Sequence, residues 1–205
     1  MVSLCIESVF KIGFLNNISN MNSQEEKYKV KKHIHLFASW SASRATSTSP
    51  VNRFKVEAGQ KILEKSFIRN FILNPDSLPK SHEEFNKEHK IWREQIISLS
   101  GKHTKEFSHG IAAKLINVYL KTIIVCGGFH NHENTQFIHP PIDSVLLKEL
   151  AKIDFGNNAK FWRKANKEAW SKFDSDFYQE VIDEIRKGIG DEPLWKIEEY
   201  WRGYQ

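Results

Sequence analysis

The chain has 205 residues, of which 40% are hydrophobic and 27% charged, a composition typical of a globular protein with enough apolar material for one core. Its formal net charge of +5 favours polyanionic partners such as nucleic acid. With only two cysteines, Cys5 and Cys126, the sequence excludes a disulfide framework and a four-cysteine metal centre. We therefore expect a reducing, cytoplasmic location, beside the nucleoid if the protein is bacterial, and no cofactor.

The N-terminal 25 residues are predicted to be a poorly ordered leader. Their apolar opening lacks a basic segment and a cleavage site, and Glu7 and Lys11 interrupt it, so it is too short to span a bilayer. Met21 is a second candidate start, because regular patterning begins only after it. We expect no membrane association and a single helical domain over residues 26–205.

Helical periodicity dominates the rest of the chain. Pro75 and Pro79 mark a break, and strand signals are weak throughout, so the predicted fold class is all-α, a compact multi-helix domain. In the helix expected at 83–100, the inward side chains are Phe85, Ile91, Trp92 and Ile96. The predicted helices cover residues 35–45, roughly 53–67, 83–100, 110–125, 143–152, 160–172 and 175–187, before an aromatic, amphipathic C-terminal segment.

The helix at 110–125 is the most apolar, and it carries three polar residues on one face. Lys114, Asn117 and Lys121 are spaced i, i+3 and i+7. A glycine just before this helix, Gly110, permits close approach of a backbone or a phosphate. The amides of Ile111, Ala112 and Ala113 would then suit an anion.

Two charged residues, Lys114 and Asp143, lie at positions that favour nucleophilic chemistry. Lys114 lies in the first turn of its helix, where the helix dipole lowers the amine pKa and so favours the neutral, nucleophilic form. Asp143 lies at the start of the next helix, where it could stabilise a developing positive charge. The alternatives are ordinary: Asp143 as a simple N-cap and Lys114 as a solvated helix lysine.

Residues 110–117 (GIAAKLIN) and 141–145 (PIDSV) together resemble the helix-hairpin-helix DNA glycosylase superfamily, the group containing endonuclease III, MutY and oxoguanine glycosylase. The family pattern has the form LPGVGxKTA, then a helix, then PVDTHV. Lys114 falls at the Schiff-base lysine of the lyase-competent members, and Asp143 falls at the catalytic aspartate. The resemblance implies a helix-hairpin-helix element at about residues 86–125, double-stranded DNA as partner, and base excision by base flipping, with abasic-site lyase activity if Lys114 attacks.

Further residues are expected to hold the DNA if the resemblance is correct. Gly110 to Ala113, with His109 and Lys121, would contact phosphate. Four cations at helical spacing form a basic face, although a solvated helix exterior is the alternative: Lys160, Arg163, Lys164 and Lys167. Candidates for the base pocket are Asn117, Trp40, Trp92 and Trp162, the tryptophans being equally suited to a core.

The histidine-rich segment after the apolar helix does not predict a metal site. Cys126, His130, His132 and His139 match no strong structural-zinc spacing, and we expect a polar loop over residues 127–139 instead.

Three functions compete on the sequence. The first is a DNA glycosylase acting on damaged or modified bases. The second is a non-catalytic DNA-binding module of the same fold, which Ala112 in place of the second hairpin glycine and the long gap between Lys114 and Asp143 favour. The third is a helical protein-interaction domain that would use its C-terminal segment.

Overall fold

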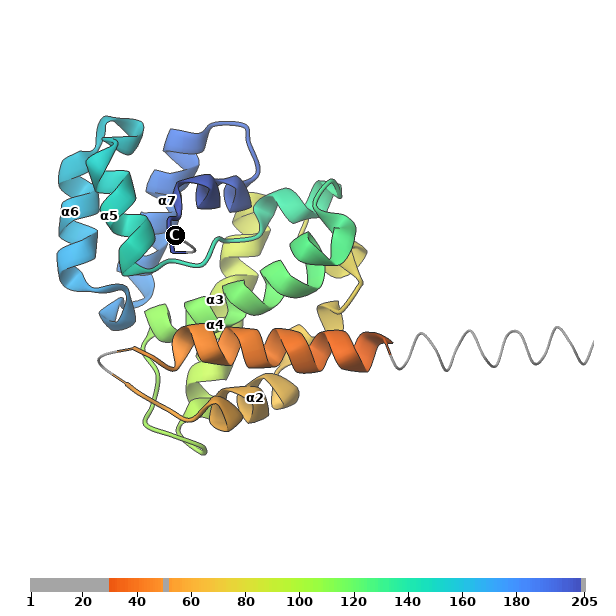
Figure 1. The fold of residues 1–205 in the computed structure, drawn as a ribbon. Helices are drawn as coiled ribbons and strands as arrows, with labels where there is room; N and C mark the ends of the chain where they lie inside the picture. Colours follow the sequence, from red (N-terminus) through yellow and green to blue (C-terminus); the bar gives the residue numbers. More distant parts are fainter. Residues whose placement is uncertain (1–29, 50–51, 204–205) are drawn as a thin grey trace, which may run out of the picture.

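The computed structural model describes residues 30–49 and 52–203 (Figure 1). The predicted leader, residues 1–25, lies outside the described residues. The described part contains helices and turns but no strand, which confirms the all-α fold class.

The described helices follow one another with short connections. A first helix covers residues 30–46, the part of it that the structure describes, and is named helix 30–46 below. The longer helices after it are α2 (Val56–Lys65), α3 (His82–Ser100), α4 (His109–Leu120), α5 (Ser144–Lys152), α6 (Ala159–Glu168) and α7 (Ser175–Ile189). The short ones are η1 (Phe67–Phe71), η2 (Pro75–Ser77), η3 (Lys121–Phe129), η4 (Glu133–Phe137), η5 (Phe155–Asn157), η6 (Trp170–Lys172) and η7 (Leu194–Tyr200).

Side-chain caps fix where four of these helices begin. The Ser81 hydroxyl accepts the Glu84 amide at α3, and the Asp174 carboxylate accepts the Phe177 amide at α7. Ser108 and Asp143 cap α4 and α5 in the same way. These are the residue types that best satisfy the free amides of a first helical turn, so the starts of these helices follow from local sequence.

The apolar helix α4 forms the centre of the fold and is buried along nearly its whole length. It packs against α3, α7 and η6, and it continues directly into η3, a π-helix that ends near Gly128 at φ +95°. Among the described residues, the stretch His109–Phe129 is long and apolar enough to cross a membrane, but the protein's own helices bury most of it. Its apolar residues are core side chains of this domain.

Three local predictions were wrong. Ile91 is 48% exposed, because the buried stripe of α3 follows Phe85, His89, Trp92 and Ile96 at spacings of four, three and four. The helix predicted over 160–172 breaks at Ala169, at φ +66°, which turns Trp170 into the interior. The loop predicted over 127–139 contains the end of η3 and all of η4.

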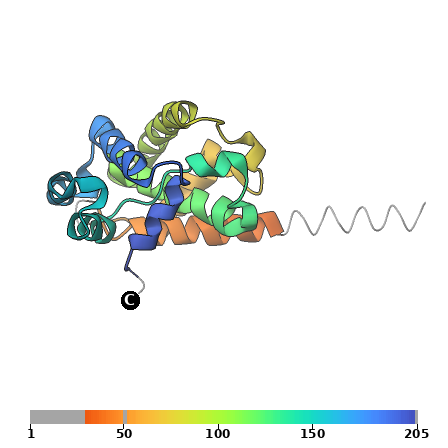
Figure 2. The same cartoon turned by 90° about the horizontal axis from the view of Figure 1, so that it is seen from above.

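The later helices form one end of the molecule. α5 and α6 lie side by side there, and η7 returns toward the middle, where it comes close to helix 30–46 (Figures 1 and 2). Segments from the two ends of the described chain therefore meet over α4. Two helices, α3 and α4, occupy the predicted hairpin region of about 86–125, but their identity as a helix-hairpin-helix element stays a prediction.

Candidate functional site

Lys114 and Asp143, which are 29 residues apart in the sequence, meet in the structure. The Lys114 Nζ donates to Asp143 Oδ2 at 3.2 Å. Their side chains are 9% and 15% exposed, so the pair is largely removed from bulk water. The structure thus brings together the amine and the carboxylate that the sequence singled out, one on α4 and one at the start of α5.

Asp143 is both a helix cap and a partner of the amine. Its Oδ1 accepts the backbone amides of Val145 and Leu146, each at 3.0 Å. The indole Nε1 of Trp201 lies 3.2 Å from Oδ1 and 3.1 Å from Oδ2. The interpretation of Asp143 as an ordinary N-cap is therefore correct, and it coexists with the ion pair, because Oδ1 accepts the helix amides and Oδ2 accepts the Lys114 amine.

The pKa of the Lys114 amine is lowered, chiefly because burial penalises its charged form; the nearby Asp143 carboxylate opposes this shift. The Trp170 ring lies 4.4 Å from Nζ and covers one side of the amine. The lowered pKa of Lys114 matches the expectation from sequence, but its main physical cause is desolvation and not the helix dipole.

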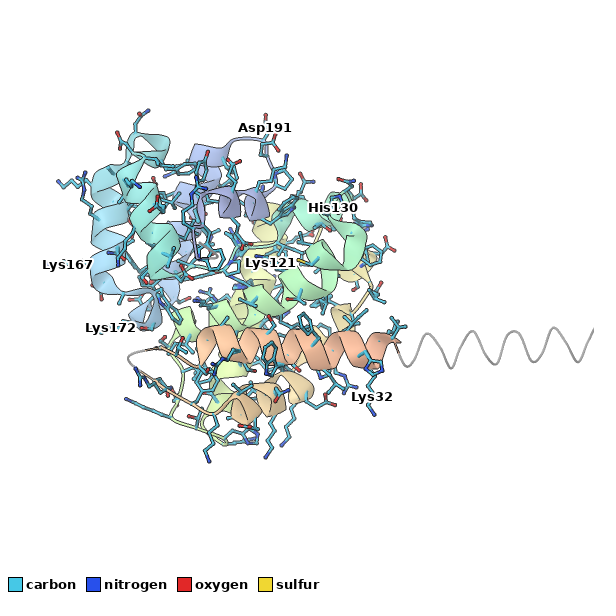
Figure 3. The ribbon with its side chains drawn as sticks, in the orientation of Figure 1. Lys32, Lys121, His130, Lys167, Lys172 and Asp191 are labelled. Carbon is cyan, nitrogen blue, oxygen red and sulfur yellow. The ribbon has the colours of Figure 1, made fainter. Side chains whose placement is uncertain are left out.

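A pocket of about 610 Å³ opens onto this pair. A second ion pair lines it, between Lys121 at the start of η3 and Glu198 of η7. Burial raises the pKa of Glu198; Lys121 opposes that shift and Asp143 adds to it. Lys121 lies at the centre of the face shown in Figure 3. The remaining lining residues are Phe37, Ser41, Ala45, Thr48, Val118, Thr122, Cys126, Pro141 and Trp201.

The sequence did not indicate Glu198 and Trp201 as site residues. The only available signal was the aromatic, amphipathic C-terminal segment, which equally suits core packing. Tertiary folding alone brings this segment over α4, so its role in the pocket could be seen only in the structure.

A buried polar network holds the Asp143 segment against α4. The Asn117 side chain donates to the Pro140 carbonyl at 2.8 Å and to the Tyr178 hydroxyl at 3.0 Å, and His89 Nε2 lies 2.8 Å from its oxygen. His139 lies 3.1 Å from the same Tyr178 hydroxyl. Asn117 is thus not a base-pocket residue, because it is 1% exposed and its side chain faces the interior.

The turn at Gly110 does not present free amides. The Gly110 amide donates to the Phe173 carbonyl at 3.0 Å, and Ile111 and Ala112 donate to Ser108. A Cβ at Gly110 would lie 1.8 Å from the Trp170 carbonyl oxygen, so glycine is needed for packing against η6. Residues 110–113 are all buried. The phosphate contacts expected from them do not fit this packing, since η6 covers the turn.

Two of the predicted base-pocket tryptophans belong to the core. Trp92 packs between Phe71 and Phe85, and Trp162 donates its indole N–H to the Phe155 carbonyl. Trp40 differs, because it is 49% exposed on helix 30–46 with its ring 6.1 Å from that of Phe37.

The predicted basic face is present on the outside of α6. Lys160, Arg163, Lys164 and Lys167 are the four cations, of which Lys164 lies over the Phe177 ring at 4.8 Å. Lys167 lies at the edge of the face shown in Figure 3. His109 is half-buried, and burial lowers its pKa.

The histidines of the segment after α4 are dispersed among different partners. His132 pairs with Asp76, whereas His139 is buried and lies 2.9 Å from Asn86 Oδ1. Within residues 30–49 and 52–203, no three His, Cys, Asp or Glu side chains are arranged to hold a metal ion.

Comparison of the chain with protein-family models, with curated proteins and with solved structures finds no match. The chemistry open to this pocket therefore follows from its own residues.

Proposed function

We propose that the protein is a DNA N-glycosylase that excises a modified base with Lys114 as its nucleophile, and therefore carries abasic-site lyase activity. The observation that carries the proposal is the 3.2 Å contact between the buried Lys114 amine, whose pKa is lowered, and the Asp143 carboxylate, which caps α5. Both groups lie at the wall of an open pocket. A buried amine with a lowered pKa and a charged partner, at the wall of a cavity, is a candidate for a catalytic group.

The pocket suits a flipped nucleotide in size and lining. Its volume of about 610 Å³ lies within the usual range of small-ligand sites. Phe37 and Trp201 offer aromatic surfaces to a base, and the Lys121–Glu198 pair offers a hydrogen-bond donor beside an acceptor. A base edge with an acceptor next to a donor would complement that pair.

The reaction requires one proton to leave the Lys114 amine for solvent before attack, so that Asp143 stays ionised. The neutral Nζ then bonds to C1′ of the flipped nucleotide while the bond from C1′ to the base nitrogen breaks, and its electron pair leaves with the base, which takes up a proton. Asp143 stabilises the positive charge that develops on the sugar. A further proton then passes from Nζ to O4′ as the bond from C1′ to O4′ breaks, which opens the sugar ring and leaves a protonated Schiff base between Nζ and C1′. Loss of a proton from C2′ lets the bond from C3′ to its phosphate oxygen break, which cleaves the strand.

DNA would be held by the basic face of α6. Because the amides of residues 110–112 bond within the protein, phosphate contacts are assigned to the cations of that face: Lys160, Arg163, Lys164 and Lys167.

The proposal is tested by incubating the protein with duplexes that carry oxidised, alkylated or deaminated bases and measuring free base. We expect release from at least one of them, and a loss of about 100-fold or more in Asp143→Asn. The matched control is Asp174→Asn, because Asp174 caps α7 in the same way outside the pocket, and this variant should retain activity. Salt-sensitive DNA binding without release from any duplex would instead indicate a binding module.

A further inference from the structure

We propose that a second cavity, separate from the Lys114–Asp143 pocket, binds a small phosphorylated molecule through Lys31, Lys32 and Arg69. The cavity has a volume of about 710 Å³ and lies between helix 30–46, the end of α2 and η1. Its other lining residues are His35, Leu36, Glu64, Asn70 and Ile72. No step of the proposed base excision uses these residues, so the site is independent of that function.

Helix 30–46 presents a different side to each of the two cavities. Its residues that line the second cavity are Lys31, Lys32, His35 and Leu36. Its residues that line the Lys114–Asp143 pocket are Phe37, Ser41 and Ala45. Because an α-helix has about 3.6 residues per turn, the two sets project to different sides. In Figure 3, Lys32 extends from the start of this helix, away from Lys121 of the Lys114–Asp143 pocket.

The second cavity carries more positive than negative charge. Glu64 is its one carboxylate among the described residues, and this group already pairs with Arg69 Nη1 and His35 Nε2. Burial lowers the pKa of His35, against the effect of Glu64, so the imidazole is neutral at neutral pH. Lys31 and Lys32 are exposed and form no ion pair within the described chain. Two positive charges therefore remain unpaired at the wall, and an anionic ligand would balance them.

Phosphate matches the donors that the wall offers. Only Nη1 of Arg69 forms a hydrogen bond within the described chain, so the rest of the guanidinium is open to a ligand. This planar group can bind phosphate through two parallel N–H donors. A phosphate monoester carries about 1.5 to 2 negative charges at neutral pH, close to the charge of the two unpaired lysines. Leu36, which is 47% exposed, and Ile72 offer apolar surface to the organic part of such a molecule.

The inner wall of the second cavity is held in place from the core. His35 is 5% exposed, and its Nδ1 lies 2.8 Å from the hydroxyl of Tyr119, a fully buried residue of α4. His35 in turn contacts Glu64, which holds Arg69. The guanidinium is therefore positioned before a ligand arrives, which lowers the entropic cost of binding.

The size of the site favours a small molecule over duplex DNA. A volume of about 710 Å³ lies within the usual range for small-molecule sites. Duplex DNA presents its phosphates along the outside of a rod, and an exposed row of cations such as that on α6 can follow them. A hollow lined by three segments of the chain can instead enclose one phosphoryl group and the molecule attached to it.

The test measures binding of inorganic pyrophosphate by isothermal titration calorimetry, with chloride keeping the ionic strength constant. We expect one binding site in wild type, and an affinity about tenfold or more weaker in Lys31→Gln/Lys32→Gln and in Arg69→Gln. The double variant should fold, because neither lysine forms an ion pair within the described chain. The matched control is Lys102→Gln/Lys105→Gln, which removes two exposed charges that line neither cavity and should bind like wild type.

The outcomes distinguish this site from its alternatives. Absence of pyrophosphate binding in wild type, equal weakening in the control, or unchanged affinity in either variant of the cavity overturns the proposal. Loss of duplex binding in Lys31→Gln/Lys32→Gln with unchanged pyrophosphate affinity makes the lysines a DNA contact and overturns it as well. Base release is not part of this readout, so failure of the glycosylase proposal leaves the pyrophosphate result unaffected.

Discussion

The side-chain amide of Asn117 donates to the backbone carbonyl of Pro140 at 2.8 Å, and this bond joins the helix that carries Lys114 to the extended segment that leads to Asp143. Asn117 lies one helical turn after Lys114, and Pro140 lies three residues before Asp143. The distance between the amine and the carboxylate is therefore set from within the core, by a side chain whose hydrogen bonds go to Pro140, Tyr178 and His89.

We expect Asn117→Ala to reduce base release more strongly than it reduces stability. Removing the amide leaves buried groups without partners, at about 1–3 kcal/mol for each unsatisfied group. Urea denaturation measures that loss. Asn52→Ala is the matched control, because Asn52 is also buried and bonds the Lys105 and Glu106 carbonyls away from the pocket. If both variants lose activity only in proportion to stability, Asn117 has no positioning role.

Asp143 should contribute separately to stability, as a helix cap, and to base release, as a charge. Asparagine can still cap a helix, whereas alanine cannot, so Asp143→Ala should be less stable than Asp143→Asn by about 1 kcal/mol. Base release should fall to the same low level in both, because both lack the charge beside Lys114. Thermal unfolding and base-release rates measure the two effects. Normal activity in Asp143→Asn would show that the carboxylate is only a cap.

The stability of the fold should decrease in mild acid. Burial holds the pKa of His89 and His139 well below 6.5, so between those lowered values and 6.5 the unfolded chain binds protons that the folded protein does not. Each histidine then lowers the unfolding free energy by about 1.4 kcal/mol per pH unit as the pH falls below 6.5. Denaturant titrations at about pH 7.5 and about pH 5.5, on either side of that value, measure how steeply the unfolding free energy falls with pH. His89→Gln should make this fall less steep. An unchanged slope in this variant would exclude His89 as a source.

The basic face of α6 should determine how DNA binding responds to salt. Changing Lys160, Arg163, Lys164 and Lys167 together to Gln should lower the slope of log affinity against log salt by up to about 0.9 for each phosphate that is no longer neutralised. Lys61→Gln/Lys65→Gln on α2, which removes exposed charges elsewhere, should leave the slope close to that of wild type. Equal effects per charge removed in the two sets would mean that only the net charge matters.

Local sequence was sufficient to predict much of the fold and the principal pair. The all-α class followed from helical periodicity, and Lys114 and Asp143 were singled out because each was expected near the start of a helix. Asp143 does cap α5, whereas Lys114 lies in the second turn of α4. The role of Gly110 could not be inferred, since a glycine that admits a phosphate and one that admits the Trp170 carbonyl look alike in sequence. Glu198 and Trp201 were missed because only the return of η7 over α4 brings them to the pocket.

The central claim is that the Lys114 amine acts as a nucleophile, and borohydride trapping on a duplex with an abasic site tests it most directly. We expect a covalent protein–DNA adduct that peptide mass mapping places on Lys114, that forms faster as the pH rises toward an inflection below 10.5, and that is absent in Lys114→Met. That variant should fold, because Asp143 keeps its amide and indole donors. An adduct that persists in Lys114→Met, maps to another lysine, or never forms in wild type would contradict the account.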